Sequence, residues 1–314
     1  MPDQTAVPGS FTRLLPCAVM LVTPLFFSTN MIFGRLVVPE VAPFTLAFLR
    51  WTLAALALAP WVLSARGAAS GYLRQAAWHW LLLGFLGMWV CGGGVYLALA
   101  HTSATNGTLI YTTAPLMILI LERLFFSRPV SLRELAGIAI GFLGVAIIVL
   151  RGSLAALVTL DFNLGDLLFV GAALSWAVYS VLLRNRATEG LDTLALFGLI
   201  AIAGALLLAP VAAGEWWRGA PMPVTFSAWS GIAGIVVFAS LLAFSGFQFG
   251  VNRLGAATTG AFMYLLPPYG VGLAVFVLGE PFRAYHAVGI ATVLTGLVLA
   301  TWRRPVPARQ AASR

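Results

Sequence analysis

The polar and aromatic residues that could bind a ligand lie within long apolar stretches of the sequence. Two of these stretches, TLIYTTAPLMIL and GAFMYLLPPYGV, also contain proline. Inside a helix a proline removes an N–H donor, which frees a carbonyl of the preceding turn to face a partner or a ligand. Helical spacing places the hydroxyls on the same face as the prolines. Simple kinks in packed helices are the alternative to a cavity. The sequence predicts helix breaks or gates at Pro115, Pro267 and Pro268 and ligand contacts from Thr108, Tyr111, Thr112 and Tyr264.

Further candidates lie in four other apolar stretches. Polar groups in the middle of a membrane span are costly in lipid, so they should face the protein interior or a cavity. Aromatic and amide groups that point inward would suit a ligand with apolar and polar parts. For Trp89 a plain packing role is also open. The predicted ligand contacts from these stretches are Asn30, Trp89, Tyr96, Trp176, Tyr179 and Gln248.

Arg50 is the cation that lies well inside an apolar stretch, LAFLRWTLAALALAP. Its guanidinium could pair bidentately with a substrate carboxylate, which makes it a candidate binding residue. The alternatives are that the side chain extends toward the lipid headgroups, or that it pairs with Glu40 and fixes its helix.

Several classes of chemistry are disfavoured or excluded. All 18 basic residues are arginine, which excludes a retinal Schiff base and a P-loop lysine. The arginines are scattered among short loops, so nucleic-acid binding is not expected. The three histidines show no metal-ligand spacing, and the two cysteines lie in apolar stretches, so no metal or other cofactor is expected. The carboxylates lie near the ends of the stretches, which argues against a proton or sodium relay.

The stretches that carry these residues are long enough to cross a membrane. Hydrophobic residues make up 61% of the 314 residues and charged residues only 9%. A helical span needs roughly 20 apolar residues, and the long stretches lack the alternation of a membrane β-barrel. The sequence therefore predicts an all-α integral membrane protein with ten spans, near 14–34, 43–63, 78–100, 106–126, 132–150, 164–183, 193–213, 228–250, 256–278 and 284–302.

An internal repeat divides the chain into two halves. A shift of 152 residues places Pro115 on Pro267, Gly137 on Gly289 and Gly144 on Gly296. An odd number of spans in each half forces the second half to enter the membrane from the opposite side. We therefore predict two inverted five-helix repeats, 14–150 and 164–302, around a central cavity. The repeat is imperfect, because Arg128 stands where the second half has Glu280.

The arginines also predict which side each end faces. A cytoplasmic N-terminus places thirteen arginines inside and four outside, as expected if both termini are cytoplasmic in a bacterial inner membrane. Gly137 and Gly141 form a GxxxG pair, which permits a close helix contact and a weak homodimer. The expected partners are therefore the lipid bilayer, a small-molecule substrate and at most a second copy of the chain.

Three segments, ALSWAVYSVLLRN, LAFLRWTLAALALAP and GAATTGAFMYLLPPYGVGLAVFVLGEPF, resemble characteristic segments of the EamA-like family in the drug/metabolite transporter superfamily. The resemblance implies an exporter of amino acids or related amphiphilic metabolites, with a central cavity between its helices. Trp176, Tyr179 and Tyr264 are similar to positions in bacterial aromatic amino-acid exporters. Thr112 and Thr113 depart from that branch, which carries aromatic residues there.

Together these features predict a transporter that works by alternating access and without an ion gradient. Amino acids, aromatic ones among them, are the leading substrate class. A passive channel is the first alternative, and a membrane-embedded enzyme is the second. No covalent chemistry is expected, because the sequence offers no cluster of carboxylate, cysteine and histidine within a span.

Overall fold

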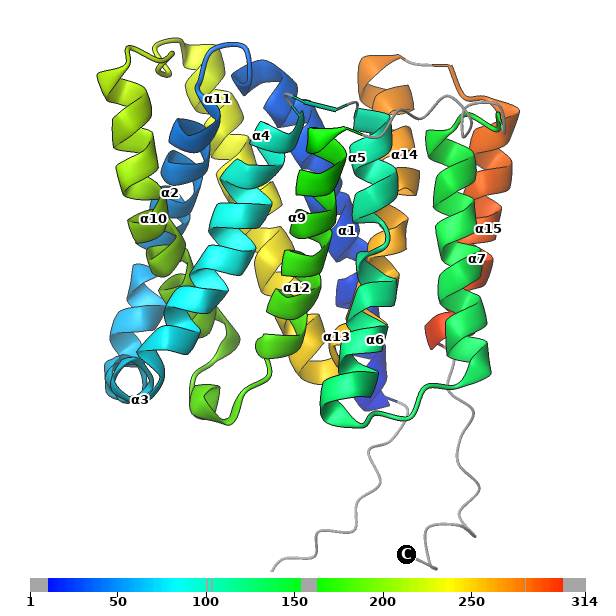
Figure 1. The fold of residues 1–314 in the computed structure, drawn as a ribbon, viewed down its shortest axis with the longest axis horizontal. Coiled ribbons are helices and arrows are strands. Elements are labelled where there is room, and N and C mark those ends of the chain that lie inside the picture. The colour runs from blue at the N-terminus through cyan, green and yellow to red at the C-terminus, as the bar shows by residue number, and fades with distance from the viewer. Residues whose placement is uncertain (1–10, 100, 103, 154–162, 280, 302–314) are drawn as a thin grey trace, which may run out of the picture.

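The computed structural model describes residues 11–99, 101–102, 104–153, 163–279 and 281–301. Their helices form one bundle (Figure 1), and ten segments are long and apolar enough to cross a membrane. The predicted all-helical membrane architecture is confirmed. Six spans are single helices: α1 (Phe11–Val37), α2 (Pro43–Ser64), α7 (Leu132–Val149), α9 (Leu164–Leu182), α10 (Thr193–Trp217) and α15 (Ala284–Thr301).

The other four spans change their helix type or break within the membrane. The third consists of α3 (Arg66–Gly84), the π-helix η1 (Phe85–Gly94) and α4 (Val95–Leu99). The eighth consists of α11 (Phe226–Gly234), the π-helix η3 (Ile235–Leu242) and α12 (Ala243–Leu254). The fourth joins α5 (Ala104–Tyr111) to α6 (Ala114–Phe126). The ninth joins α13 (Ala256–Phe262) through the 3₁₀ turn η4 (Met263–Leu265) to α14 (Leu266–Leu278).

The start of the third span corrects one prediction. The predicted spans 43–63 and 78–100 leave residues 66–74 as a loop between them, but these residues form the first part of α3, which bends at Ala76 (φ −142°, ψ 38°). Figure 1 shows this first part nearly end-on, because it lies across the bundle. The Tyr72 hydroxyl donates to His79 Nδ1 at 2.8 Å, and His79 Nε2 donates to the Leu182 carbonyl at 3.0 Å. These bonds hold the bent segment against α9.

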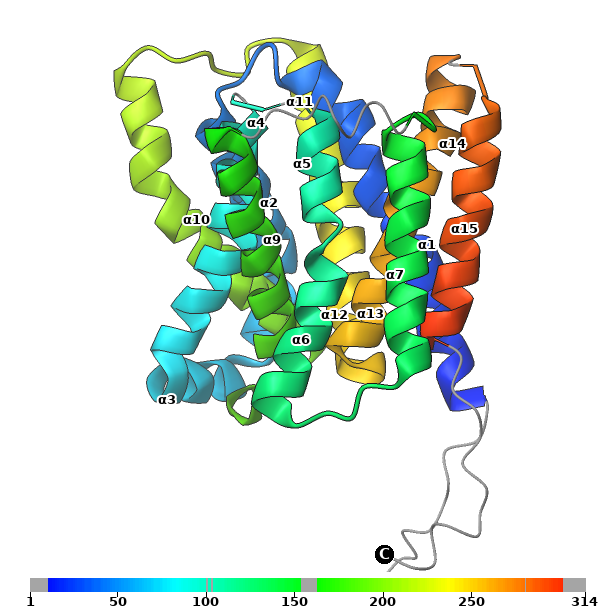
Figure 2. The same cartoon turned by 45° about the vertical axis from the view of Figure 1, so that its right-hand side comes forward.

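The two halves repeat each other closely. α6 and α14 both start and end 152 residues apart, and so do α7 and α15. The residue that follows each of the first pair is left-handed, with φ of 50° at Ser127 and 70° at Gly279. α7 and α15 run antiparallel and side by side (Figures 1 and 2), so the second repeat is inverted. The predicted two-repeat architecture is confirmed.

Glycine allows α7 and α15 to meet backbone to backbone, in a contact that we call the seam. A Cβ atom on Gly144 would lie 2.5 Å from Val293 N and 2.8 Å from Gly289 O. Gly137 and Gly296 face each other's backbone in the same way. The GxxxG pair of α7 is therefore used within one chain, and a homodimer through that pair is not needed to explain it. The oligomeric state stays a prediction.

We call the end of the bundle where α1 begins and α15 ends the terminal end, and the opposite end the far end (Figure 2). The connections from α6 to α7, from α9 to α10 and from α12 to α13 lie at the terminal end (Figure 1). The connections from α1 to α2 and from α10 to α11 lie at the far end. This division allows the two mouths of the bundle to be compared.

Candidate functional site

The fourth and ninth spans are interrupted immediately before proline. Pro115 lies in the first turn of α6, and Pro267 lies in the first turn of α14. A proline in the first turn costs no helix hydrogen bond, because an N–H there has no partner within its helix. The prolines thus start new helical segments instead of kinking continuous ones. Pro268, the next residue, also lies in the first turn of α14, and a gating role for the three prolines stays a prediction.

The two interrupted spans meet at Gly260 in α13 and Pro115 in α6. A Cβ atom on Gly260 would lie 2.9 Å from Ile118 Cδ1 and 3.7 Å from Pro115 Cα. Ser28 of α1 donates a hydrogen bond of 2.9 Å to the Leu266 carbonyl at the start of α14. The interruption in the ninth span, which belongs to the second repeat, therefore contacts two helices of the first repeat, α1 and α6.

An aromatic group, which we call the central cluster, fills the middle of the bundle. Trp176 packs against Phe247 at 4.7 Å and against Phe244 at 5.6 Å between ring centroids. Such tilted and edge-to-face pairs contribute about 0.5–1.5 kcal/mol each beyond their buried area. Trp176, Phe244 and Phe247 are at most 6% exposed, so the rings are closely packed in this structure, and the central cavity expected from the repeat stays a prediction. The cluster consists of Phe27, Trp51, Trp176, Phe197, Phe244 and Phe247 from α1, α2, α9, α10 and α12.

One polar pair lies beside this cluster. Gln248 Nε2 donates to the Tyr179 hydroxyl oxygen at 3.1 Å, and the two side chains are 1% and 0% exposed. Gln248 Oε1 is buried and has no hydrogen-bond partner among the described residues. An unsatisfied buried acceptor costs about 1–3 kcal/mol, which a donor on a ligand would recover. The structure thus brings three predicted site residues together: Trp176, Tyr179 and Gln248.

Arg50 contacts the eighth span. Its position contradicts two expectations, that its side chain extends to the lipid headgroups or pairs with Glu40. Its Nε donates to Ser240 Oγ at 2.7 Å, and its Nη2 donates to the Ala239 carbonyl at 2.7 Å. The guanidinium also lies 4.6 Å above the Trp51 ring. The side chain therefore neither extends to the headgroups nor pairs with Glu40, which accepts a hydrogen bond from Thr225. The π-helical η3 presents the carbonyl and hydroxyl that hold it, and a role in substrate binding stays a prediction.

Four predicted residues line the third and fourth spans at other places. Trp89 packs against Phe85 and Phe44 at 5.4 and 5.6 Å between ring centroids. The Tyr111 hydroxyl interacts with the Cys91 thiol, which links the fourth span to the third. The Thr112 hydroxyl, in the turn between α5 and α6, donates to the Leu109 carbonyl of α5 at 2.8 Å. Thr108 is half-buried one turn earlier, and its carbonyl accepts from the Thr112 N–H.

Three further residues were predicted from the sequence: Tyr264, Asn30 and Tyr96. Tyr264 is 1% exposed, its ring lies over Gly141 of α7, and its hydroxyl has no hydrogen-bond partner among the described residues. Asn30 Oδ1 is also buried without such a partner. Tyr96 belongs to α4, but its side chain lies outside the described residues. The binding roles of all three stay predictions.

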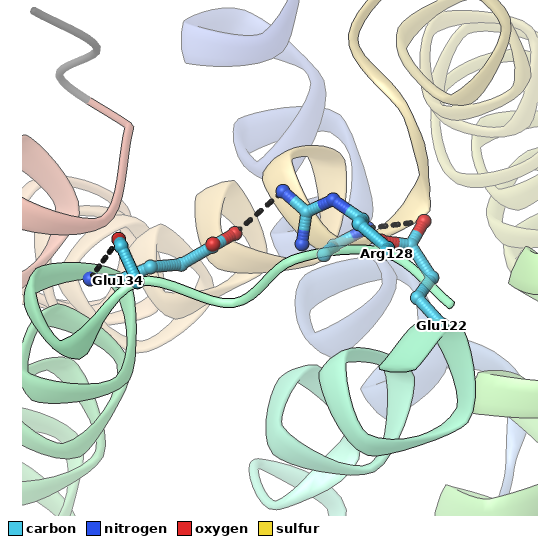
Figure 3. Close-up of polar contacts among 5 residues, drawn as sticks. Glu122, Arg128 and Glu134 are labelled. Atoms are coloured by element: carbon cyan, nitrogen blue, oxygen red, sulfur yellow. Dashed lines mark hydrogen bonds and ion pairs between the residues drawn. The ribbon is translucent and has the colours of Figure 1, made fainter. Parts of the chain in front are cut away.

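A second polar site lies at the terminal end, in the connection from α6 to α7 (Figure 3). Arg128 Nη2 donates to Glu134 Oε1 at 2.7 Å, and Arg128 Nε lies 3.2 Å from Glu122 Oε2. Glu122 Oε1 accepts a 3.3 Å hydrogen bond from Ala257 N, in the first turn of α13. Carboxylates are favourable at a helix N-terminus, so this bond also stabilises the start of the ninth span. The three charged residues connect both repeats.

A pocket of about 630 Å³ opens beside this ion network, between α6, α9, the 183–192 connection and the junction of α12 with α13. Glu122 and Arg128 line it, together with Arg184, Arg186 and Glu189 near its mouth. The pocket thus carries cations and anions a few residues from the interrupted ninth span. It is large enough for a small metabolite.

Sequence reasoning missed two parts of these sites. The four phenylalanines of the central cluster, Phe27, Phe197, Phe244 and Phe247, were overlooked because phenylalanine is common in the spans. The spacing of Phe244 and Gln248 by four residues could have placed them on one face. The ion network was missed because Glu122 and Glu134 were assigned to span ends without a partner, although Arg128 lies six residues from each.

Comparison with known proteins identifies the family. The EamA-like transporter family model matches residues 14–150 and 163–302. The uncharacterized transporter YyaM of Bacillus subtilis is 25% identical over 90% of this chain and 92% of its own length. An uncharacterized transporter of Archaeoglobus fulgidus is 27% identical over 93% of this chain and 98% of its own. A probable terminal-alkyne amino-acid exporter of Streptantibioticus cattleyicolor is 26% identical over 68% of this chain and 69% of its own.

A solved crystal structure supports the same fold. It superposes with a TM-score of 0.73 at 21% identity, over 91% of this chain and 97% of the other. The family model matches both repeats, and the two repeats together contain the ten segments that are long and apolar enough to cross a membrane. The chain is a multi-pass membrane transporter that belongs to the EamA-like transporter family.

Proposed function

We propose that the protein exports small amphiphilic metabolites, with amino acids as the substrate class and aromatic amino acids as the first candidates. The observation that carries this proposal is the buried Tyr179–Gln248 pair beside the central cluster. The free Gln248 oxygen can accept a hydrogen bond from an ammonium group, while the rings can pack against an apolar side chain. The name of the Streptantibioticus cattleyicolor relative, a probable amino-acid exporter, supports the same class.

Transport then proceeds by alternating access. The central cluster is closed in this structure, so a substrate reaches it only when the surrounding spans separate toward one end. The interrupted fourth and ninth spans are the segments best suited to such movement, because a short helix can tilt without bending a long one. Substrate that enters at one mouth would leave at the other after the spans rearrange.

The proposed direction is supported by the arginines. Nine arginines of the described segments lie at the terminal end: Arg13, Arg66, Arg74, Arg123, Arg128, Arg133, Arg184, Arg186 and Arg253. Four lie at the far end: Arg35, Arg151, Arg218 and Arg283. We therefore infer that the terminal end faces the cytoplasm of a bacterial inner membrane. A cysteine at exposed Ser70, in a background without Cys17 and Cys91, should react only from the cytoplasm. One at Gly219 should react only from outside, and the reverse pattern would contradict the orientation.

The main test uses purified protein in liposomes. Labelled L-phenylalanine should show saturable counterflow against unlabelled L-phenylalanine, as a carrier requires and a passive channel cannot produce. Replacing Trp176 with Leu should raise KM about tenfold or more, because it removes apolar contact with the substrate. Trp217→Leu is the matched control, since Trp217 is 94% exposed and faces away from the bundle. Counterflow of no amino acid in a panel of the common ones would reject the proposal.

Two further measurements address the energy source and the enzyme alternative. Described carboxylates such as Asp166 lie in end turns; Asp166 caps α9 and accepts from Thr102. Uncoupled flux is therefore the simpler hypothesis, and accumulation driven by a pH or sodium gradient would contradict it. No group of three or more histidine, cysteine, aspartate or glutamate residues that could hold a metal is found in the described part of the chain. Unchanged substrate after transport would further disfavour an enzyme.

A further inference from the structure

The pocket at the terminal end is a second site that the proposed transport function does not use. We propose that it receives the zwitterionic head of an amino acid before the substrate reaches the central cluster. The substrate's carboxylate would pair with Arg128 and its ammonium group with Glu122. This inference rests on the proposed function, because it assigns a second position to the same substrate.

The hydrogen bonds of Arg128 and Glu122 are incomplete. Arg128 uses Nη2 on Glu134 and Nε on Glu122, whereas its Nη1 is buried without a hydrogen-bond partner among the described residues. Glu122 Oε1 accepts from Ala257 N, whereas Oε2 faces Arg128 without hydrogen-bond geometry. A purely structural ion network would be expected to satisfy its buried atoms. Nη1 is a donor that suits a carboxylate and Oε2 is an acceptor that suits an ammonium group, and a ligand would reach these buried atoms once the two side chains shift toward the pocket.

The pocket provides the space and an approach for such a ligand. Its volume of about 630 Å³ exceeds what the head of an amino acid needs, so the side chain also fits. Arg184, Arg186 and Glu189 are exposed at its mouth and form no ion pair with another described residue. Charges of both signs at a mouth attract a zwitterion in a preferred orientation. A singly charged ligand would meet repulsion from one of them.

The other mouth of the transporter lacks this arrangement. The repeat places Ala274 at the position of Glu122 and His286 at the position of Arg128's second partner, Glu134. Glu280 takes the position of Arg128, which reverses the charge. The proposed site therefore exists at one end only, as expected for a carrier that loads its substrate at that end. Its occupant would also touch the carboxylate that caps α13, the first segment of the interrupted ninth span.

The test compares three probes and two faces of the membrane. The probes are L-phenylalanine, 2-phenylethylamine and 3-phenylpropanoate, which share a ring and differ in charge. We expect the zwitterion to bind purified protein at least tenfold more tightly than either analogue. Glu122→Gln and Arg128→Gln should raise the KM for L-phenylalanine about tenfold at the terminal face and less than twofold at the far face. Arg123→Gln, one residue away and outside the pocket, should change neither value.

The variant Arg128→Lys keeps the test valid if Arg128→Gln fails to fold. It keeps the charge that Glu134 needs but loses the planar fork, so it should melt near the parental temperature and still show the raised KM at the terminal face. An unchanged KM in all three variants would overturn the inference while leaving the central site intact. An equal rise at both faces would also overturn it. If the parent transports no zwitterion, the proposed function fails first and this inference fails with it.

Discussion

The seam between α7 and α15 and the crossing of α6 with α13 use glycine in different ways. At the seam, a Cβ atom on Gly144 would meet backbone atoms, Val293 N at 2.5 Å and Gly289 O at 2.8 Å. At the crossing, a Cβ atom on Gly260 would first meet the end of a side chain, Ile118 Cδ1 at 2.9 Å. A backbone held in two long helices cannot move aside, whereas a terminal methyl group can rotate. The seam is closed to substitution, and the crossing can adjust.

This difference shows how one repeated sequence supplies both a fixed and an adaptable part. The seam consists of two continuous helices of 18 residues each. The crossing involves shorter helices, with 13 residues in α6 and 7 in α13. Short pieces are held by few hydrogen bonds of their own and depend on their neighbours. We therefore expect transport to move the interrupted spans against a seam that stays closed.

Gly144→Leu should have the largest effect. A leucine there must push apart two helix backbones, which should cost about 3 kcal/mol or more and prevent folding. Fluorescence-detected size-exclusion chromatography of the tagged protein should show little monodisperse material. Gly272→Leu is the matched control, since nothing lies within 4 Å of a Cβ atom at Gly272. Equal yields from the two variants would show that the seam is not closed.

Pro115→Ala and the double change of Pro267 and Pro268 to Ala should have the next largest effect. Each restores a backbone N–H at an interruption and favours a longer continuous helix, so the span should tilt less freely. We expect initial transport rates to fall about tenfold while the amount of inserted protein stays within about twofold of the parent. Counterflow in liposomes, normalised to protein, measures this. Parental rates in both variants would mean that the interruptions do not take part in transport.

Gly260→Ala should have a smaller effect, because the obstacle is Ile118 Cδ1 and not backbone. The added methyl group should cost about 1 kcal/mol of stability and lower transport about two- to threefold. Ile118→Val removes the obstructing atom, so the double variant should recover part of both losses. A double variant no better than Gly260→Ala would show that the strain falls on the more distant Pro115 instead.

Ser127→Gly should have the smallest effect and the opposite sign. Ser127 adopts φ 50°, and its counterpart Gly279 adopts φ 70° at the same place in the second repeat. Glycine tolerates this conformation better than serine, so the change should stabilise the protein by about 0.5–1 kcal/mol. Thermal unfolding in detergent measures it, and Gly279→Ser should shift the melting temperature down. Two shifts of the same sign would show that the two turns are not equivalent.

Much of the architecture could be predicted from the sequence because it depends on composition and on spacing. The ten spans follow from long apolar runs, and the inverted repeat follows from prolines and glycines at one offset. The interruptions before Pro115 and Pro267 follow from the geometry of proline itself. Trp176, Tyr179 and Gln248 could be chosen because polar and aromatic groups in mid-span must turn inward.

The remaining features depend on partners that no local pattern reveals. The glycines and arginines of residues 66–74 suggest a loop, yet bonds from Tyr72 and His79 to α9 hold the segment as a helix. The π-helices depend on the packing of the third and eighth spans, and η3 supplies the groups that bind Arg50. The indole of Trp80 donates to the Leu199 carbonyl of α10 at 2.6 Å, a partner that no local pattern indicates. Most of these features depend on a contact with a residue more than 60 positions away in the sequence. The exception is the Tyr72–His79 hydrogen bond, which forms within α3.

The reciprocity of the seam has a consequence for how the chain can diverge. Gly137 corresponds to Gly289 and Gly144 to Gly296 by the repeat, and in space Gly137 meets Gly296 while Gly144 meets Gly289. These are two copies of one contact, as in the self-complementary interface of a symmetric dimer. In a dimer of identical halves, one mutation would alter both copies at once. Joined in a single chain, the copies mutate separately, so one half can gain an Arg128 while the other keeps a Glu280, and the two mouths are free to become different.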